Sequence, residues 1–573
     1  MHQPRSFLIW RSWLLQKKQM LCLCLPDGKV TKDPTEMRRH TVDFYIDLFR
    51  AYDCDVDAAV ELHQGLPQLD PGDREALGLE ITLDELTAAV SQMASGKAPG
   101  IDGLPSDFFK HFWTIMGQDP LDVFKQCFIK GTLPASCRRA VLSLLPKKGD
   151  LALLKNWRPV ALLCTDYKIL SKVLSNRLKI VIDFIIGADQ SYCVPDRSMF
   201  DNLFLMRDVF DICKIYDISV GIISIDQEKA FDRVDHEFLF STLKTFGVGE
   251  GFLSWVKLLY RDACCVVKVG GGLSVPVPVR RGIRQGCPIS GQLYSIAIEP
   301  ILCRLRSRLR GLSLPELAQM PAVVVSAYAD DVNVFICNEG DIQELQKSLG
   351  LYGKASSAKV NWEKSEACLV GEWCVGSIPR LPGNLKWGKR GVKSLGVFLG
   401  NEDFQSQNWE GVLEKVEARL SKWKWLLPHL SYRGRALIVN NLIASSLWHK
   451  LIVLVPPSGL LKEVQRLLVN FFWSGQHWLR APVLYLPVAE GGQGLVDILS
   501  RTAAFRLQTA QRLLYGCSRC WIAPPRLLLR FAGRLRLDKQ LFLLRSSEVD
   551  LTGLTPFYSS VINAWQTLKV TRA

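Results

Sequence analysis

Strand-like and helix-like patterns of apolar residues alternate along most of this chain. Short apolar runs that predict buried strands lie at 141–146, 158–163, 220–225, 323–328 and 332–336. The last two runs flank a very short turn, Ala329-Asp330-Asp331, and residues 265–279 predict another hairpin built around three glycines. Strands connected by turns and separated by helices predict a mixed α+β fold.

Helical spacing of apolar residues separates these strands. Leu83, Leu86 and Val90 share one helical face, and Thr82 with Glu85 can form a capping box at the start of that helix. Residues 231–246 predict one amphipathic helix, another helix should follow Pro288, and beyond about residue 405 the pattern becomes helical and basic. With 573 residues the chain is too long for one compact core, so several domains are expected.

Composition and charge narrow the possible partners. The chain is 48% hydrophobic and 22% charged, as in folded proteins, while 71 Lys and Arg against 56 Asp and Glu give a net charge of +15. Basic proteins commonly bind polyanions, because each neutralised phosphate releases counterions. Nucleic acid is therefore the expected partner, and a merely basic protein is the alternative.

Cysteines and the N-terminus bear on localisation. The 17 cysteines are scattered, and Cys517 with Cys520 form the only CxxC, which lacks the further ligands that a zinc site needs. The apolar segment 7–15 is interrupted by Arg11 and lacks the continuous core of a signal peptide. No apolar run reaches the roughly 18 residues that span a bilayer. We therefore expect an intracellular protein, in the nucleus or cytoplasm, that is not secreted and has no membrane partner.

Two carboxylate clusters are candidates for chemistry. Asp226 ends the apolar run 222–226, and Asp330-Asp331 occupy the tight turn. A carboxylate that closes a buried strand needs compensation, and divalent cations prefer carboxylate oxygens. Two magnesium ions about 3.5–4 Å apart can stabilise the attacking and leaving oxygens of a phosphoryl transfer. The simpler interpretation of an isolated Asp-Asp is that it only forms the turn, because Asp favours hairpin loops. The motifs elsewhere in this chain favour the metal-binding interpretation instead.

The motif Asp226-Gln-Glu-Lys-Ala-Phe-Asp232, followed far downstream by Tyr328-Ala-Asp-Asp331, resembles reverse transcriptases of non-LTR retrotransposons, the LINE family. Further strings that resemble this family, in the family's order, are Gly96-Lys-Ala-Pro-Gly-Ile-Asp-Gly103, Leu145-Pro-Lys-Lys-Gly149, Asn156-Trp-Arg-Pro159, Arg284-Gln-Gly-Cys-Pro-Ile-Ser290, Lys359-Val-Asn-Trp-Glu-Lys-Ser365, Leu395-Gly396 and Glu490-Gly-Gly-Gln-Gly-Leu495. Each string alone is weak, but together, in order and at the right spacing, they are specific.

The resemblance implies a right-hand polymerase and assigns its parts. Residues 1–80 would form an N-terminal extension, 81–215 the fingers, 216–402 the palm, 403–500 a helical thumb and 501–573 a C-terminal helical segment. The activity implied is RNA-directed DNA synthesis, which extends a primer 3′-hydroxyl with deoxynucleoside triphosphates. The implied cofactor is Mg²⁺, as two ions, with Mn²⁺ as a substitute. The implied partners are an RNA template, a DNA primer, dNTPs and the element's own RNA in a ribonucleoprotein.

The resemblance also implies roles for individual residues. The metal ligands would be Asp226, Asp330 and Asp331, together with Ile225, and Asp330 ranks above Asp331 because successive strand residues face opposite ways. Lys359 would be an acid for the pyrophosphate leaving group, although Lys364 is a close neighbour. The residues implied for dNTP binding are Lys147, Arg158, Phe231, Gln285 and Gly286. Phe231 would be the steric gate against a 2′-hydroxyl, and periodicity alone equally allows a core residue there.

The thumb segment 409–435 interleaves Trp with Lys and Arg, which is typical of nucleic-acid binding. Trp423 and Trp425 are two residues apart and cannot both face one side of a helix, so at most one should contact nucleic acid.

Two departures from the family leave alternatives open. Neither an upstream nuclease domain nor a downstream Cys/His knuckle is present, so we expect a fragment of a longer element. The alternatives to an active reverse transcriptase are a catalytically idle RNA-binding remnant and an RNA-dependent RNA polymerase. Phe231 argues against the RNA polymerase. Group II intron and telomerase enzymes are related but less similar in the strings quoted.

Overall fold

The computed structural model describes residues 20–147, 149–316, 321–373, 378–388, 390–516, 521–533, 536–545 and 547–570. Segment 7–15 and the Cys517–Cys520 pair lie outside these residues. The chain divides into two compact units, each described by itself below. Unit 1 comprises Met1–Arg197, Asp226–Arg308 and Gln343–Asn361, and unit 2 comprises Ser198–Ile225, Leu309–Ile342 and Trp362–Ala573.

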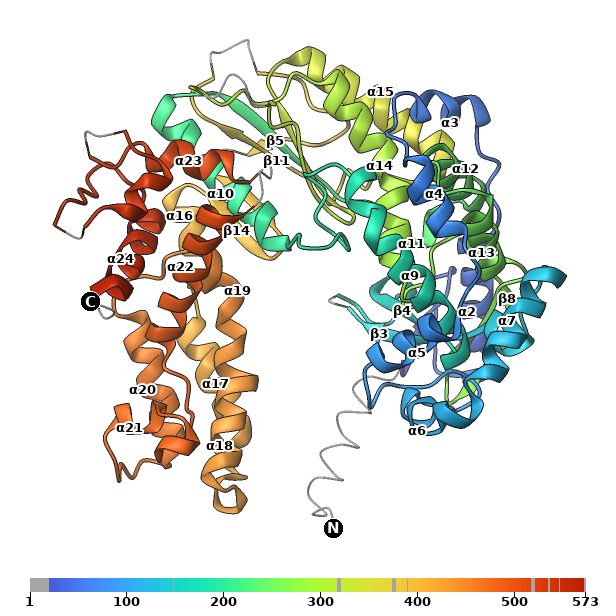
Figure 1. The fold of residues 1–573 in the computed structure, drawn as a ribbon, viewed down its shortest axis with the longest axis horizontal. Coiled ribbons are helices and arrows are strands. Elements are labelled where there is room, and N and C mark those ends of the chain that lie inside the picture. The colour runs from blue at the N-terminus through green and yellow to red at the C-terminus, as the bar shows by residue number, and fades with distance from the viewer. Residues whose placement is uncertain are drawn as a thin grey trace. The chain divides into compact units, whose positions relative to one another are not determined.

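Unit 1 combines helices with a sheet of order β4-β3-β6-β7, in which β8 also pairs with β6 (Figure 1). Its strands are β1 Leu23–Cys24, β2 Val30–Thr31, β3 Arg139–Pro146, β4 Trp157–Leu162, β6 Cys264–Val269, β7 Gly272–Leu273 and β8 Val277–Pro278. Its helices are α2 Pro34–Leu48, α3 Val56–His63, α4 Pro71–Gly78, α5 Leu83–Gln92, α6 Ser106–Met116, α7 Gln118–Lys130, α8 Ala135–Arg138, η1 Leu154–Asn156, α9 Thr165–Ile185, α11 Ala230–Arg233, α12 His236–Thr245, α13 Glu250–Tyr260, α14 Ser290–Arg308 and most of α15 Glu339–Ser356. Strand β3 runs antiparallel to β4 and parallel to β6.

Unit 2 holds a second sheet of order β12-β11-β5-β10-β9 and the hairpin β13-β14. Its strands are β5 Val220–Ile225, β9 Val325–Tyr328, β10 Asp331–Ile336, β11 Glu366–Val370, β12 Trp387–Gly388, β13 Gly391–Ser394 and β14 Val397–Gly400. Its helices are α10 Met199–Tyr216, α16 Glu402–Ser406, α17 Val412–Lys424, η2 Leu427–His429, α18 Tyr432–Ile438, the π-helical η3 Val439–Ala444, α19 Ser445–Val453, α20 Leu460–Trp473, α21 Ala481–Tyr485, η4 Val488–Glu490, α22 Ile498–Tyr515, α23 Ala523–Leu529, η5 Lys539–Leu543 and α24 Pro556–Val570. Within this unit, α20 packs against α17, α18 and α22 (Figure 1).

Most predicted elements are present, including both hairpins and the mixed α+β composition. Helix α5 begins with the predicted capping box: Thr82 Oγ1 accepts from the Glu85 amide, and Glu85 accepts from the Thr82 amide. The prediction of one helix over 231–246 is wrong. The chain leaves helical geometry at Val234, and Asp235 caps a new helix by accepting from the amides of Glu237 and Phe238.

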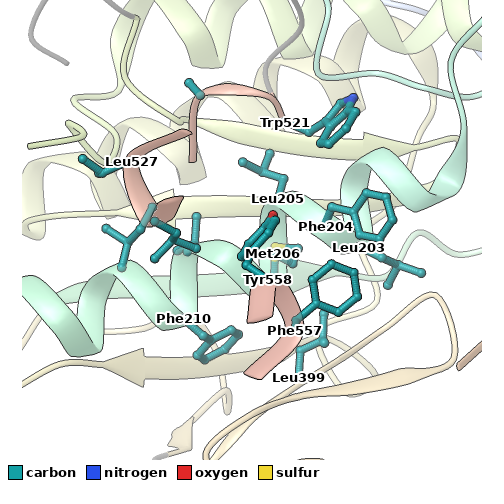
Figure 2. Close-up of a cluster of buried hydrophobic side chains, with 14 of the residues drawn as sticks. Leu203, Phe204, Leu205, Met206, Phe210, Leu399, Trp521, Leu527, Phe557 and Tyr558 are labelled. Atoms are coloured by element: carbon teal, nitrogen blue, oxygen red, sulfur yellow. The ribbon is translucent and has the colours of Figure 1, made fainter. Parts of the chain in front are cut away.

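One hydrophobic core in unit 2 joins α10 to the sheet and to the C-terminal helices. Figure 2 shows Phe557 and Tyr558 of α24 packed against α10, and the rings of Phe204 and Phe557 lie 6.0 Å apart between centroids. Trp521 packs on the other side of Phe204, at 5.5 Å. The segment after residue 500 therefore shares its core with the β5 sheet.

A second core of unit 2 lies among α17 to α22, where Val439, Ile443 and Leu451 are fully buried. Within the described residues, Tyr432–Val453 is the one helical stretch long and apolar enough to cross a membrane, judged by length and composition only. A core helix meets the same criterion, and 44% of this stretch's most apolar window is buried. The finding is weak and assigns no membrane role.

Helix α10 carries a half-buried carboxylate that makes stability depend on pH. Burial, and then the charge of Asp208, raise the pKa of Asp211 to about 7. Between the unfolded pKa near 3.9 and this value the folded state binds more protons than the unfolded state, so stability falls as pH rises through that window. We expect Asp211→Asn to raise the melting temperature at pH 8 and to have little effect at pH 5. Thermal melts at both pH values check this, and an equal shift at both would contradict it.

Candidate active site

The Asp-Asp turn is a tight hairpin in unit 2. Strand β9 ends at Tyr328, which is the ladder partner of Asp331 in β10, so only Ala329 and Asp330 form the turn. Ala329 adopts a φ of 55°, a value that two-residue hairpins require and that costs a non-glycine residue energy. Asp330 is half-buried and Asp331 is exposed, so the two carboxylates are not equivalent. The predicted three-residue turn is one residue too long.

In the unit 2 sheet, the neighbouring strand β5 ends where β10 begins, beside the Asp-Asp turn. Ile225, its last residue, is the ladder partner of Val332, which directly follows Asp331. Asp226 is bonded to Ile225 and is therefore the first residue beyond this end of β5. The strand is buried in the middle of the sheet, between β10 and β11. Within unit 2, the sheet register therefore places the end of β5 at Ile225 next to the start of β10, directly after the Asp330-Asp331 turn.

A buried asparagine on α10 supports the hairpin. Asn202 is 4% exposed, and its Nδ2 donates to the Ala327 carbonyl at 2.9 Å and to Ser326 Oγ at 3.0 Å. Both acceptors belong to β9, which leads into Ala329 and Asp330. Asn202 is not among the residues that the sequence motifs predict for the site. Its only signal is a polar Asp201-Asn202 pair inside an otherwise apolar helical segment.

In unit 1 the residues after Asp226 pair with the segment around Lys359. The Asp226 carbonyl accepts from the Asn361 amide at 2.8 Å, and the Glu228 amide donates to the Lys359 carbonyl at 2.8 Å. The Lys359 Nζ lies 3.5 Å from Glu228 Oε2, and its side chain is 64% exposed. Lys359 is thus held beside the Asp226 segment by backbone and side-chain contacts, and its role as an acid stays a prediction.

Phe231 lies on a platform of aromatic rings in unit 1. Its ring stacks on Tyr294 of α14 with 4.1 Å between centroids and 16° between planes, and Tyr192 meets it edge-on at 6.1 Å. The Phe231 carbonyl accepts from the Ile283 amide at 2.7 Å. A ring packed against two other rings, on a residue whose backbone is also hydrogen-bonded, has little freedom to move. This rigidity suits a steric gate and equally suits a packed residue.

The residues predicted to bind dNTP in unit 1 gather around β3 and β4. Strand β3 ends at Pro146, the ladder partner of Trp157, and Lys147 is the first residue beyond it. Arg158 is the second residue of β4 and pairs with Leu145, so both cations lie at the same end of the β3–β4 pair, and both are exposed. Arg158 Nε donates to Gln285 Oε1 at 3.3 Å. Gly286 has a φ of 117°, and a Cβ there would lie 2.6 Å from the Ala161 carbonyl. The glycine is therefore required by the approach of this loop to β4.

Away from these carboxylates, one group within the described residues has ligand atoms close enough for a metal ion. Oxygen or sulfur atoms of Asp102, Cys164 and Asp166 lie within 4.8 Å of one another. They sit at the N-terminus of α9, where the helix dipole disfavours a cation. Asp166 already accepts from Ser136 Oγ and from the Tyr167 amide. Hydrogen bonds therefore account for this group without a metal.

Two further motifs have clear structural positions in unit 2. Leu395 and Gly396 form the two-residue turn between β13 and β14, with φ values of 46° and 82°. In the Gly-rich segment 490–495, the Gly494 carbonyl accepts from Asn440 Nδ2 at 2.8 Å, which ties it to the π-helical η3.

Trp425 is 48% exposed, while Trp423 packs against the second core. The prediction that these two tryptophans face different surroundings is confirmed.

Comparison with known proteins identifies the class. Residues 145–399 match the family model described as "Reverse transcriptase (RNA-dependent DNA polymerase)", and this range contains β5, the β9–β10 hairpin and the Gln285 loop. The chain therefore carries a reverse transcriptase domain, and its similar proteins are those of non-LTR retrotransposons. The resemblance inferred from the motifs is confirmed.

Three relatives illustrate the match. The chain is 45% identical to the "Transposon TX1 uncharacterized 149 kDa protein" of Xenopus laevis over 97% of this chain and 43% of that protein. It is 25% identical to a "Retrovirus-related Pol polyprotein from type-1 retrotransposable element R2" of Popillia japonica, over 49% of this chain and 38% of that protein. It is 22% identical to the "Probable RNA-directed DNA polymerase from transposon BS" of Drosophila melanogaster, over 61% and 39%. The chain thus spans less than half the length of these relatives.

Proposed function

We propose that this chain is an RNA-directed DNA polymerase that extends a primer 3′-hydroxyl with dNTPs on an RNA template. In this reaction the primer hydroxyl attacks the α-phosphate of the incoming nucleotide, a phosphodiester bond forms, and pyrophosphate leaves. The observation that carries the proposal is the register of β5 with β10, in which Ile225 pairs with Val332 beside the Asp330-Asp331 turn. A reverse transcriptase domain implies use of an RNA template, a primer and dNTPs.

The proposed metal ligands are Asp226, Asp330 and Asp331, with Ile225 contributing through its backbone. Reverse transcriptases use divalent metal ions, and an all-oxygen donor set fits Mg²⁺ or Mn²⁺ rather than zinc or copper. Two bound ions would neutralise charge on the triphosphate and activate the attacking hydroxyl. The protein's own contribution would be to carry the carboxylates at the ends of the paired strands β5 and β10, while Asn202 supports β9, which leads into the turn.

The proposed nucleotide site combines cations with a planar floor. Lys147 and Arg158 would contact the triphosphate, because Lys provides a point charge and Arg can hold two phosphate oxygens at once. Phe231 would lie beneath the sugar, and Gln285 and Gly286 near the base pair. Lys359 would donate a proton to the pyrophosphate. The right-hand division into fingers, palm and thumb, the intracellular location and a ribonucleoprotein with the element's own RNA belong to the same proposal.

Primer extension with purified chain tests the proposal. A labelled DNA primer on an RNA template, with Mg²⁺ and dNTPs, should be extended, and chelation of the metal should stop extension. RNA binding without any extension would contradict the proposal and support an idle RNA-binding remnant. Faster extension with ribonucleotides than with dNTPs would support an RNA polymerase instead.

Phe231 provides a separate prediction about sugar selection. Replacing Phe231 with Val removes the ring that would meet a 2′-hydroxyl, so discrimination between dCTP and CTP should fall by roughly 10- to 200-fold. The ratio of kcat/KM values for the two nucleotides measures it. Phe240→Val, on the neighbouring helix α12, is the matched control and should leave the ratio unchanged. A ratio unchanged in Phe231→Val would assign the ring to packing alone.

A further inference from the structure

A buried carboxylate next to the steric gate has no role in the site as proposed above. Asp232 is 7% exposed and lies at the end of the motif that begins with Asp226. Its Oδ1 accepts a hydrogen bond from Gln285 Nε2 at 3.2 Å. Gln285 Oε1 in turn accepts from Arg158 Nε at 3.3 Å. One side chain amide therefore connects a buried carboxylate to an exposed guanidinium.

The chemistry of an amide makes this connection directional. A Gln side chain can turn by half a rotation, which exchanges its oxygen with its nitrogen. When ionised, the Asp232 carboxylate can accept hydrogen bonds but cannot donate them, so it requires the NH₂ group of Gln285. The Gln285 oxygen is thereby left facing Arg158. If the amide turned over, two oxygens would face each other at Asp232 and two donors would face each other at Arg158.

The backbone around Asp232 fixes the distance between these groups. The amides of Gly282 and Ile283 donate to the carbonyls of Val234 and Phe231, each at 2.7 Å. A Cβ on Gly282 would lie 2.7 Å from the Asp232 carbonyl, so the loop can approach this closely only with glycine. Gln285 is thus carried by a loop that is anchored to the backbone of the gate residue itself.

We propose that Asp232 is a positioning residue for dNTP binding, which orients Gln285 and, through it, holds Arg158 ready for the triphosphate. The inference rests on the proposed function and adds a determinant of nucleotide affinity that does not itself touch the nucleotide. The charged side chains around it, Lys229, Lys147 and Arg158, all favour its ionised form, whereas burial raises its pKa to about 6. Titratable groups that face it from other packed elements of the described chain include Tyr45 of α2 and Cys265 of β6.

A matched pair of substitutions separates the hydrogen bond from the shape. Asp232→Asn keeps an oxygen that can accept from Gln285, and Asp232→Leu has nearly the same shape without any acceptor. In single-nucleotide extension, KM for the dNTP should rise about tenfold in Asp232→Leu, the effect of one hydrogen bond, with kcat nearly unchanged. KM should stay within about threefold of wild type in Asp232→Asn. In a Gln285→Ala background, Asp232→Leu should add little, because the residue through which it acts is gone.

The controls make each outcome decisive. Asp235→Ala removes a carboxylate that is also buried but caps α12, so it should lower the melting temperature without raising KM. Equal KM values for the Asn and Leu variants, or multiplicative effects of Asp232→Leu and Gln285→Ala, would overturn the inference while leaving the polymerase proposal intact. If wild type does not extend primers, the polymerase proposal fails. Equilibrium titration with a fluorescent dNTP then compares the Asn and Leu variants directly, and equal affinities would overturn the inference.

Discussion

Replacing Asp330 with Asn is expected to reduce primer extension by roughly 10³-fold or more, because a neutral amide cannot take a carboxylate's place at a metal ion. Asp330 is half-buried in a turn whose backbone is already set by Ala329, and Asn fits the same space, so the fold should be kept. Asp331→Asn should have a smaller effect, since this carboxylate is exposed at the start of β10. Single-turnover extension at saturating dNTP measures both.

The control for this experiment is Asp403→Asn on α16, an exposed carboxylate in the same unit. Its extension rate should match that of wild type. Activity of Asp330→Asn within tenfold of wild type would remove Asp330 from the metal site. Melting temperatures of the three variants should agree within a few degrees, which excludes unfolding as the cause.

Removing the Asp208 carboxylate is expected to destabilise unit 2 by about 3–5 kcal/mol, because it leaves the charge of Arg207 buried without its partner. Arg207 donates to Asp208 Oδ1 at 2.6 Å and to the Val453 carbonyl at 2.8 Å, and Tyr558 donates to Asp208 Oδ2 at 2.6 Å. Arg207 and Asp208 are 3% and 0% exposed. This network joins α10 to α24, which are far apart in sequence.

Urea unfolding of Asp208→Leu, Tyr558→Phe and the double variant Arg207→Met with Asp208→Leu tests this. Tyr558→Phe removes one hydrogen bond and should cost about 1–2 kcal/mol. The double variant removes both charges and should recover much of the stability that Asp208→Leu loses, because replacing a buried ion pair with apolar groups is often neutral or stabilising. A loss below about 1 kcal/mol for Asp208→Leu would show that the ion pair does not hold α24 to α10.

The elements predicted correctly from the sequence are those whose signal is local. Strand β5 is a continuous apolar run, the β9–β10 hairpin has a turn of small and acidic residues, and α5 begins with adjacent capping partners. The apolar periodicity does not predict the break at Val234, because it continues through 231–246 on both sides of Asp235. Whether a lone Asp caps a helix or points to solvent depends on backbone geometry that periodicity does not record.

The residues of the site also divide into those with a local sequence signal and those whose partners are distant in sequence. Asp226 and Asp330 could be proposed from strand ends and motif order, since both signals lie in neighbouring residues. Asn202 and Asp232 could not, because Asn202 acts on β9 and Asp232 acts on the Gln285 loop, and these partners are distant in sequence. A polar residue in an apolar helix indicates that a partner exists without indicating which residue it is. Tertiary packing supplies that information.

The shared metal site can be tested directly by replacing Mg²⁺ with Fe²⁺, which generates hydroxyl radicals at its binding site and cuts the adjacent backbone. In the complex with template, primer and dNTP, cuts should appear together around Ile225–Gln227 and around Ala329–Val332, and Asp330→Asn should abolish both sets. Cuts at only one of these segments, or cuts that survive Asp330→Asn, would show that the carboxylates do not bind common ions and would contradict the polymerase mechanism proposed for this chain.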